Sequence, residues 1–598
     1  MRKMFKRTIV AVITFAALLC SGLTVNAAKP TQWLIYWYVC GTDIETNRIA
    51  FGSGTDLMSN NPNALILADP DKMPGDATRC INEVEAANLS PDVKIFMQAG
   101  GTYVWGHPKF RDLNAKIQTG LGQGDLIGNG NGFYLQWHLK NPLQPNTLMS
   151  NGKIGRYVYD KYHRNWHARE QLPISGLKDS ATDMGSQAGL ISFLQAGQKL
   201  EQSLYPDGNV RRVFIFVDHG QGSINHPLLN GVICSDAYTK NMLSLKEVRD
   251  AFATVRNGWT NPDEKPFEVV AFDACLMSTY ETAVALENVA NYMVASQETT
   301  YGKVGLNYTD LLNELSKNPF MRGKELGKVI CNTRWDDSKV TDKEFSNNSS
   351  DLFTFSVVDL SENKMIALKT AYENFGAEAF NVAQQNPSDM LYTFAKFRNA
   401  ASVAERYPSS EINAGLVDLR NFADNLRATF PELKEAGDAL VKAIDNAVVY
   451  NKRGDALNRG GGLSTYYPFD LFGEDTRAGI EYYKSLGNSN LVPKSSGKFY
   501  DFLYKNMQGK SVNLSALKNK MVDVDEEKKI ASVELSEDEL KNVAGVRYQC
   551  IYIEPRNDDP EKMNALFLGS DSNVSENRQT GTFELNLRTH VHKRLSKV

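Results

Sequence analysis

The feature that most constrains the fold of this chain is the alternation of short apolar runs with segments of helical periodicity. The runs are too short for ordinary helices and rich in β-branched and aromatic residues, which is typical of buried strands. They span 33–39, 93–97, 213–217, 269–272 and, more weakly, 292–295. This pattern predicts an α/β fold.

Helical patterns lie between these runs. One covers 190–200, a second opens at a capping box formed by Ser244 and Glu247, and a third covers 279–286. Strands that alternate with helices predict a mostly parallel sheet flanked by helices on both faces. In such sheets, ligands bind beyond the carboxyl ends of the strands.

The length of 598 residues exceeds one ordinary core, and we expect two to four domains. Loops and hairpins interrupt the alternating pattern at about 102–180. The expected division is a leader at 1–28, an α/β core at 29–323, a helical or mixed α/β region at 324–520, and a small β-rich module at 521–598. The module ends abruptly, and we expect it to be incomplete.

The N-terminus has the pattern of a secretory signal peptide. Basic residues at positions 2–7 precede an apolar run at 8–19, and Val25 and Ala27 are small residues at the expected cleavage positions. A membrane anchor is the alternative, but the run is shorter than the roughly 20 residues that a span needs. Leu19 before Cys20 is too large for a lipoprotein signal. We therefore expect a secreted, periplasmic or cell-surface protein with no membrane span in the mature chain.

Composition excludes several function classes. The net charge of −4 shows no basic excess, so nucleic acid is not an expected partner. Six cysteines remain after Cys20 and are dispersed, with no C-x-x-C pair.

His163 and His167 have the spacing of metal ligands on one face of a helix. Their Gly-rich surroundings disfavour that helix, so no metal site is predicted.

Two apolar runs deliver reactive side chains in the same way. VFIFVD is followed by His219 and Gly220, and VVAFDA is followed by Cys275. If these strands are parallel neighbours, both side chains emerge at one edge of the sheet. An imidazole near a thiol favours the nucleophilic thiolate and later protonates a leaving amine. The Gly220 and Cys275 N–H groups are then candidates for an oxyanion hole.

The segments FIFVDHGQG and VVAFDACLMSTYE resemble the clostripain family of cysteine peptidases, in the wider group of caspases, legumains and gingipains. Supporting matches are Asp183-Met184-Gly185, Ala295-Ser296-Gln297-Glu298-Thr299 and YVCGTDIE at 38–45. The similarity runs from about 33 to 310 and more loosely to about 500. It implies a caspase-like fold, a Cys275 nucleophile and a His219 general base and acid.

The resemblance also implies a substrate pocket and a processing site. Asp273 matches an acidic residue in the pocket for the side chain before the scissile bond, which implies cleavage of protein or peptide substrates after Arg or Lys; a capping aspartate is the alternative. Asp218 should point away from His219, so no triad is expected.

Members of the clostripain family are often zymogens that are cut between the catalytic His and Cys, which makes Lys240 a candidate self-cleavage site. Some members require calcium, but no site for it is evident.

Two other functions remain open at this point. An amine that captures the thioester would make the protein a transpeptidase or ligase. A non-catalytic surface protein that binds through its β-rich tail would leave Cys275 unreactive, although the intact His219 and Cys275 weigh against it.

Overall fold

The computed structural model describes most of the expected core and helical region. The described residues are 32–41, 44, 76–101, 153–160, 165–173, 183–223, 231–236, 239, 241–259, 264–300, 305–345, 350–385, 390–402, 404–408, 415–467, 474–507, 520–540, 543, 546, 548–555, 563–571, 574–577 and 579–586. The predicted signal peptide and His163 lie outside them.

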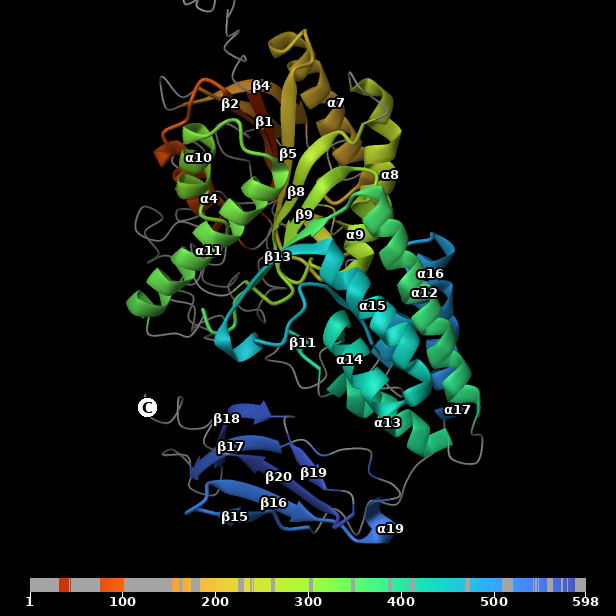
Figure 1. Ribbon diagram of the computed structural model, residues 1–598. Helices are drawn as coiled ribbons and strands as arrows, with labels where there is room; N and C mark the ends of the chain where they lie inside the picture. Colours follow the sequence, from red (N-terminus) through yellow and green to blue (C-terminus); the bar gives the residue numbers. More distant parts are fainter. Residues whose placement is uncertain are drawn as a thin grey trace, which may run out of the picture.

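A nine-stranded sheet forms the centre of the molecule (Figure 1). Its middle is a run of five parallel strands in the order β9-β8-β5-β1-β2. Their bounds are β1 Gln32–Cys40, β2 Val93–Gly100, β5 Val210–Val217, β8 Phe267–Asp273 and β9 Ala290–Ala295. These are the five predicted strands, so the predicted α/β class with a mostly parallel core is confirmed.

Antiparallel strands extend the sheet at both ends. On one side the β3–β4 hairpin, Lys153–Asp160 and Asn165–Pro173, follows β2 and accounts for part of the predicted insertion. On the other side β10, Thr354–Asp359, pairs with β9, and β13, Val448–Arg453, pairs with β10. Strands from the region expected to be mainly helical therefore complete the sheet.

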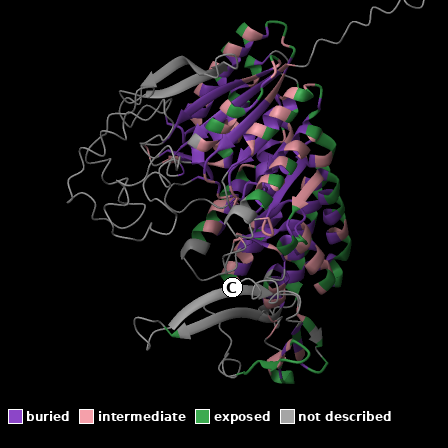
Figure 2. Cartoon of the chain, turned by 90° about the vertical axis from the view of Figure 1, so that its left-hand side faces the viewer, coloured by how far each residue is buried: buried purple, intermediate pink, exposed green. Residues whose placement is uncertain are grey.

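Helices cover both faces of the sheet (Figure 1). Side chains alternate between the faces, so Tyr36 and Phe214 enter one core whereas Trp37 and Ile215 enter the other. The first core lies under α7 Gln187–Leu204, α8 Leu245–Val255 and α9 Tyr280–Leu286; the second lies under α4 Asp76–Ala86, α10 Tyr308–Lys317 and α11 Gly323–Phe345. Figure 2 shows the central strands as almost wholly buried. The predicted capping box of Ser244 and Glu247 opens α8.

A second helical layer continues the first core. It consists of α12 Glu362–Gln385, α13 Met390–Ser402, α14 Leu419–Thr429, α15 Lys434–Ala447, α16 Glu474–Asn488 and α17 Lys494–Met507. A small sheet accompanies these helices, formed by β11 Arg406–Tyr407, β12 Leu416–Asp418 and β14 Ser464–Tyr466. β14 reaches the turn after β8 through a bridge between Thr279 and Ser464.

The C-terminal segment is β-rich, as expected. Four strands form one sheet in the order β15-β16-β20-β19, and β17 pairs with β18. The bounds are β15 Asp523–Asp525, β16 Ile530–Glu534, β17 Tyr548–Pro555, β18 Met563–Asp571, β19 Ser575–Asn577 and β20 Thr582–Asn586, with the short helix α19 at Glu537–Leu540. Figure 1 places this module beyond the helical layer.

A buried ion pair joins α7 to the central sheet. Glu201 is 3% exposed, and its two carboxylate oxygens accept hydrogen bonds from Arg212 Nε at 2.6 Å and Nη2 at 2.5 Å. Tyr36 OH donates a third hydrogen bond at 3.2 Å. The carboxylate therefore has charged and neutral partners where water is excluded, which is the condition for tolerating a buried charge.

We expect Arg212→Met to lower the free energy of unfolding by about 3–5 kcal/mol, because it leaves the Glu201 charge buried without its cation. Urea denaturation measures the change. The double variant Glu201→Gln/Arg212→Met should recover most of the loss, since its buried groups are neutral. A loss below about 1 kcal/mol in the single variant would contradict this role of the pair.

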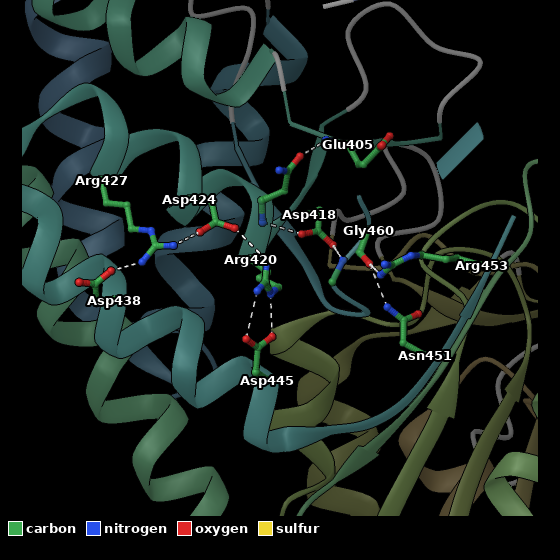
Figure 3. Close-up of polar contacts among 12 residues, drawn as sticks. Glu405, Asp418, Arg420, Asp424, Arg427, Asp438, Asp445, Asn451, Arg453 and Gly460 are labelled. Carbon is green, nitrogen blue, oxygen red and sulfur yellow. Dashed lines mark hydrogen bonds and ion pairs between the residues drawn. The ribbon is translucent and has the colours of Figure 1, made fainter. Parts of the chain in front are cut away.

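Asp418 connects the small sheet to the segment after β9. Its carboxylate, 0% exposed, accepts hydrogen bonds from Gln297 Nε2 at 2.9 Å, from Asn421 N at 2.7 Å and from Gly461 N at 2.5 Å. Figure 3 shows it beside the ion pairs that Arg420 forms on the adjacent helices. Burial raises the pKa of Asp418 to about 6, although these three donors act in the opposite direction.

The raised pKa of Asp418 predicts a pH dependence of stability. The folded state holds this proton up to a pH of about 6, whereas the unfolded chain releases it near pH 3.9, so wild type loses stability as the pH rises between these values. Asp418→Asn removes this contribution. We expect its deficit relative to wild type to shrink by about 2 kcal/mol from pH 4 to pH 7. Chemical denaturation across this range tests it, and a constant deficit would refute it.

Candidate active site

The two predicted reactive residues follow neighbouring parallel strands. β5 ends at Val217 and β8 ends at Asp273, and these two residues are register partners. One residue further, Asp218 N donates to Asp273 O at 3.4 Å. His219 and Cys275 therefore leave the sheet at the same edge, as the sequence pattern predicted, and both are half-buried.

Gly220 lies directly against the Cys275 backbone. A Cβ built on Gly220 would stand 2.1 Å from Cys275 O, so only glycine fits here without displacing the turn. Gly220 also forms a bridge with Ile233, which is anchored by the hydrogen bond from Gln221 N to Val232 O at 2.8 Å. The two backbone segments proposed for the oxyanion hole are thus adjacent.

Asp218 connects the segment that carries His219 to Ser235. It is 4% exposed, and its Oδ2 accepts from Ser235 N at 2.5 Å and from Ser235 Oγ at 3.0 Å. Ser235 belongs to β6, Ile233–Asp236, which forms a hairpin with β7, Asn241–Leu243. The carboxylate thereby connects the backbone that carries His219 to β6.

The Cys275 sulfur contacts one residue that sequence reasoning did not single out. Thr300 N donates to Sγ at 3.3 Å, and Thr300 Oγ1 lies 3.4 Å from the same atom. Leu276, which follows Cys275 in the chain, adopts φ +65° and donates its N–H to Glu298 O at 3.2 Å. Thr300 directly follows the Ala295–Thr299 match to the family, which was the available signal for it.

The turn after Cys275 is braced by residues far away in the sequence. Ser278 N donates to Ser296 O at 2.8 Å, and Ser278 O accepts from Ser464 N at 2.9 Å. Ser278 Oγ donates to Gly462 O at 2.8 Å. The predicted helix then begins as α9, with Thr279 as its N-cap. No sequence spacing indicated that Gly462 and Ser464 support the turn after Cys275.

Asp273 lies inside the protein, below this edge. It is 5% exposed, and its carboxylate accepts from Leu306 N at 3.0 Å and from Tyr308 OH at 2.8 Å. Burial raises the pKa of Asp273, whereas the Tyr308 and Leu306 hydrogen bonds and the charges of Arg79 and Arg334 lower it. Residues 301–304, next along the chain to this site, lie outside the described residues.

The structure bears only partly on the predictions about self-cleavage, metal binding and a membrane span. Lys240 lies outside the described residues. Within the described ranges, no group of three or more His, Cys, Asp or Glu side chains is placed to hold a metal ion. No helix in this part of the chain is both long and apolar enough to cross a bilayer.

Comparison with solved structures found chains of low similarity. An inactive zymogen C11 protease from Parabacteroides distasonis shares 13% identity with a TM-score of 0.41, over 77% of this chain and 98% of that one. A secreted C11 cysteine protease from Bacteroides thetaiotaomicron, in complex with an irreversible peptide inhibitor, shares 13% identity with a TM-score of 0.43, over 77% and 99%. A search of curated proteins found no match.

The sequence itself provides the assignment. The model of the Clostripain family matches residues 158–501, which is more than half of the chain and includes His219, Cys275 and the bracing residues around Ser464. Both strand ends, the turn after Cys275 and most of the second helical layer fall within this match. The chain therefore belongs to the clostripain family of cysteine peptidases.

Proposed function

We propose that this cysteine peptidase is an exported endopeptidase that cleaves after Arg or Lys, with Cys275 as nucleophile and His219 as general base and acid. The observation that supports it most is the parallel pairing of β5 with β8, which brings both residues to one edge of the sheet. Protein or peptide substrates follow from the family. Export is supported by the basic start and apolar run at 2–19.

In this proposal the Cys275 thiolate attacks the substrate carbonyl carbon, and the carbonyl π electrons move onto oxygen. The Gly220 and Cys275 N–H groups stabilise that oxyanion, a contribution that measured cases put at about 3–4 kcal/mol per donor. His219 gives its proton to the departing amine as the acyl-enzyme forms. It then takes a proton from water, which hydrolyses the thioester and releases the acid product.

Asp273 is the proposed determinant of the basic side-chain preference. It lies two residues before the nucleophile, and the family pattern places an acidic residue there. Its carboxylate already accepts three hydrogen bonds, from Leu306 N, Tyr308 OH and, at 3.8 Å, Cys80 Sγ, but a carboxylate has about four acceptor positions. The remaining position suits a guanidinium or ammonium, and low exposure would strengthen such a contact because little water screens it.

The nucleophile assignment predicts that Cys275→Ala and His219→Ala each lower kcat/KM on fluorogenic peptides ending in Arg or Lys by at least about a thousandfold. The matched control is Cys331→Ala, which removes a buried thiol from α11 and should keep near-normal activity. Activity that persists in Cys275→Ala would overturn the proposed mechanism.

The specificity assignment predicts a change of preference. We expect Asp273→Asn to reduce kcat/KM about 10- to 100-fold more for an Arg peptide than for a peptide ending in a neutral residue, because a charged hydrogen bond is lost. Asp218→Asn is the control, since it alters another buried carboxylate at the same edge that contacts Ser235. Equal losses for both peptides in Asp273→Asn would assign this residue a structural role.

A further inference from the structure

The contact between Thr300 and the nucleophilic sulfur extends the proposed mechanism. Two polar groups of Thr300 lie within hydrogen-bonding range of Cys275 Sγ. The backbone N–H is at 3.3 Å and the hydroxyl is at 3.4 Å. Sulfur is a large, weak acceptor while it is a thiol and a much better one once it is a thiolate. Thr300 thus offers the sulfur one backbone donor and one hydroxyl that can donate or accept.

The two contacts do not act alike. A backbone N–H only donates, so the sulfur must accept from Thr300 N. The hydroxyl serves both protonation states, because it accepts from the thiol S–H and donates to the thiolate by rotating its own proton. When the thiol proton passes to His219 in the proposed mechanism, the Thr300 hydroxyl can turn its own proton toward the sulfur without movement of heavy atoms.

The Thr300 position is fixed by the residues before it. Glu298 is 0% exposed and its N–H donates to Thr354 Oγ1 of β10 at 2.9 Å, while its carbonyl accepts from Leu276 N at 3.2 Å. The Glu298 carboxylate accepts from Thr299 N at 2.7 Å and from Thr299 Oγ1 at 2.9 Å. The two neighbouring hydroxyls therefore have different partners: the Thr299 hydroxyl contacts the Glu298 carboxylate, and the Thr300 hydroxyl contacts the Cys275 sulfur.

We propose that Thr300 is a further catalytic residue, whose hydroxyl donates a hydrogen bond to the Cys275 thiolate and increases the thiolate fraction near neutral pH. This inference rests on the proposed nucleophilic role of Cys275. It assigns a second source of thiolate stabilisation besides His219. Since the hydrogen bond must weaken as the sulfur attacks carbon, its benefit is confined to pH values at which the thiol would otherwise stay protonated.

The test is the pH dependence of Cys275 alkylation by iodoacetamide, followed by mass spectrometry of the peptide that contains Cys275. We expect Thr300→Val to raise the pH of half-maximal alkylation by about half to one unit, and Thr300→Ser to stay within about 0.2 unit of wild type. The variants are also compared on the fluorogenic peptide. Thr300→Val should lose activity below its pH of half-maximal alkylation and approach the activity of wild type above that pH.

Thr299→Val is the matched control, because it removes a neighbouring hydroxyl that faces Glu298 and should not move the alkylation midpoint. An unchanged midpoint in Thr300→Val would overturn the inference. So would a rate reduced equally at every pH in both Thr300→Val and Thr300→Ser, which is the result of a merely structural role. Alkylation does not require turnover, so failure of the peptidase proposal, seen as activity in Cys275→Ala, is recognised separately.

Discussion

The parallel pairing of β5 with β8 is the constraint on which the site depends. Its register places Val217 beside Asp273, and the contact continues past both strand ends to Gly220 and the Cys275 carbonyl. A shift of one residue in either strand would turn its side chains to the opposite face of the sheet. The long apolar side chains buried on both faces oppose such a shift, so the core of the molecule sets the geometry of the reactive edge.

The second half of the chain completes this edge. β10 supplies Thr354, which accepts a hydrogen bond from Glu298 N, and the Gly462–Ser464 segment braces Ser278, three residues after Cys275. Gln297, in the segment after β9, connects this segment to the small sheet. Its side chain donates a hydrogen bond to Asp418 and accepts one from Gly462 N at 2.9 Å. The small sheet that contains β14 is thus part of the support of the turn after Cys275, together with β10 of the central sheet.

Much of the central architecture was predictable because strand signals are local. Each of the five parallel strands is a short apolar run bounded by turn residues, and the capping box at Ser244 marks the start of α8 without reference to the rest of the chain. β10 and β13 were harder to place, since they lie among helical patterns and their pairing with β9 is decided by contacts between distant segments. Thr300 and Ser464 were missed for the same reason: single polar residues carry no periodic signal.

The α/β class, the five parallel strands and the family can be read from the amino-acid sequence, because apolar runs and strand-end motifs are local patterns. Three other features become visible only in the folded chain: the hydrogen bonds from Leu306 and Tyr308 to the buried Asp273, the contact of Asp218 with Ser235, and the contact of Thr300 with the sulfur. These are contacts between residues 17 to 35 positions apart in the chain. They depend on how loops leave the sheet, and loop paths are fixed by packing and hydrogen bonding across the whole molecule.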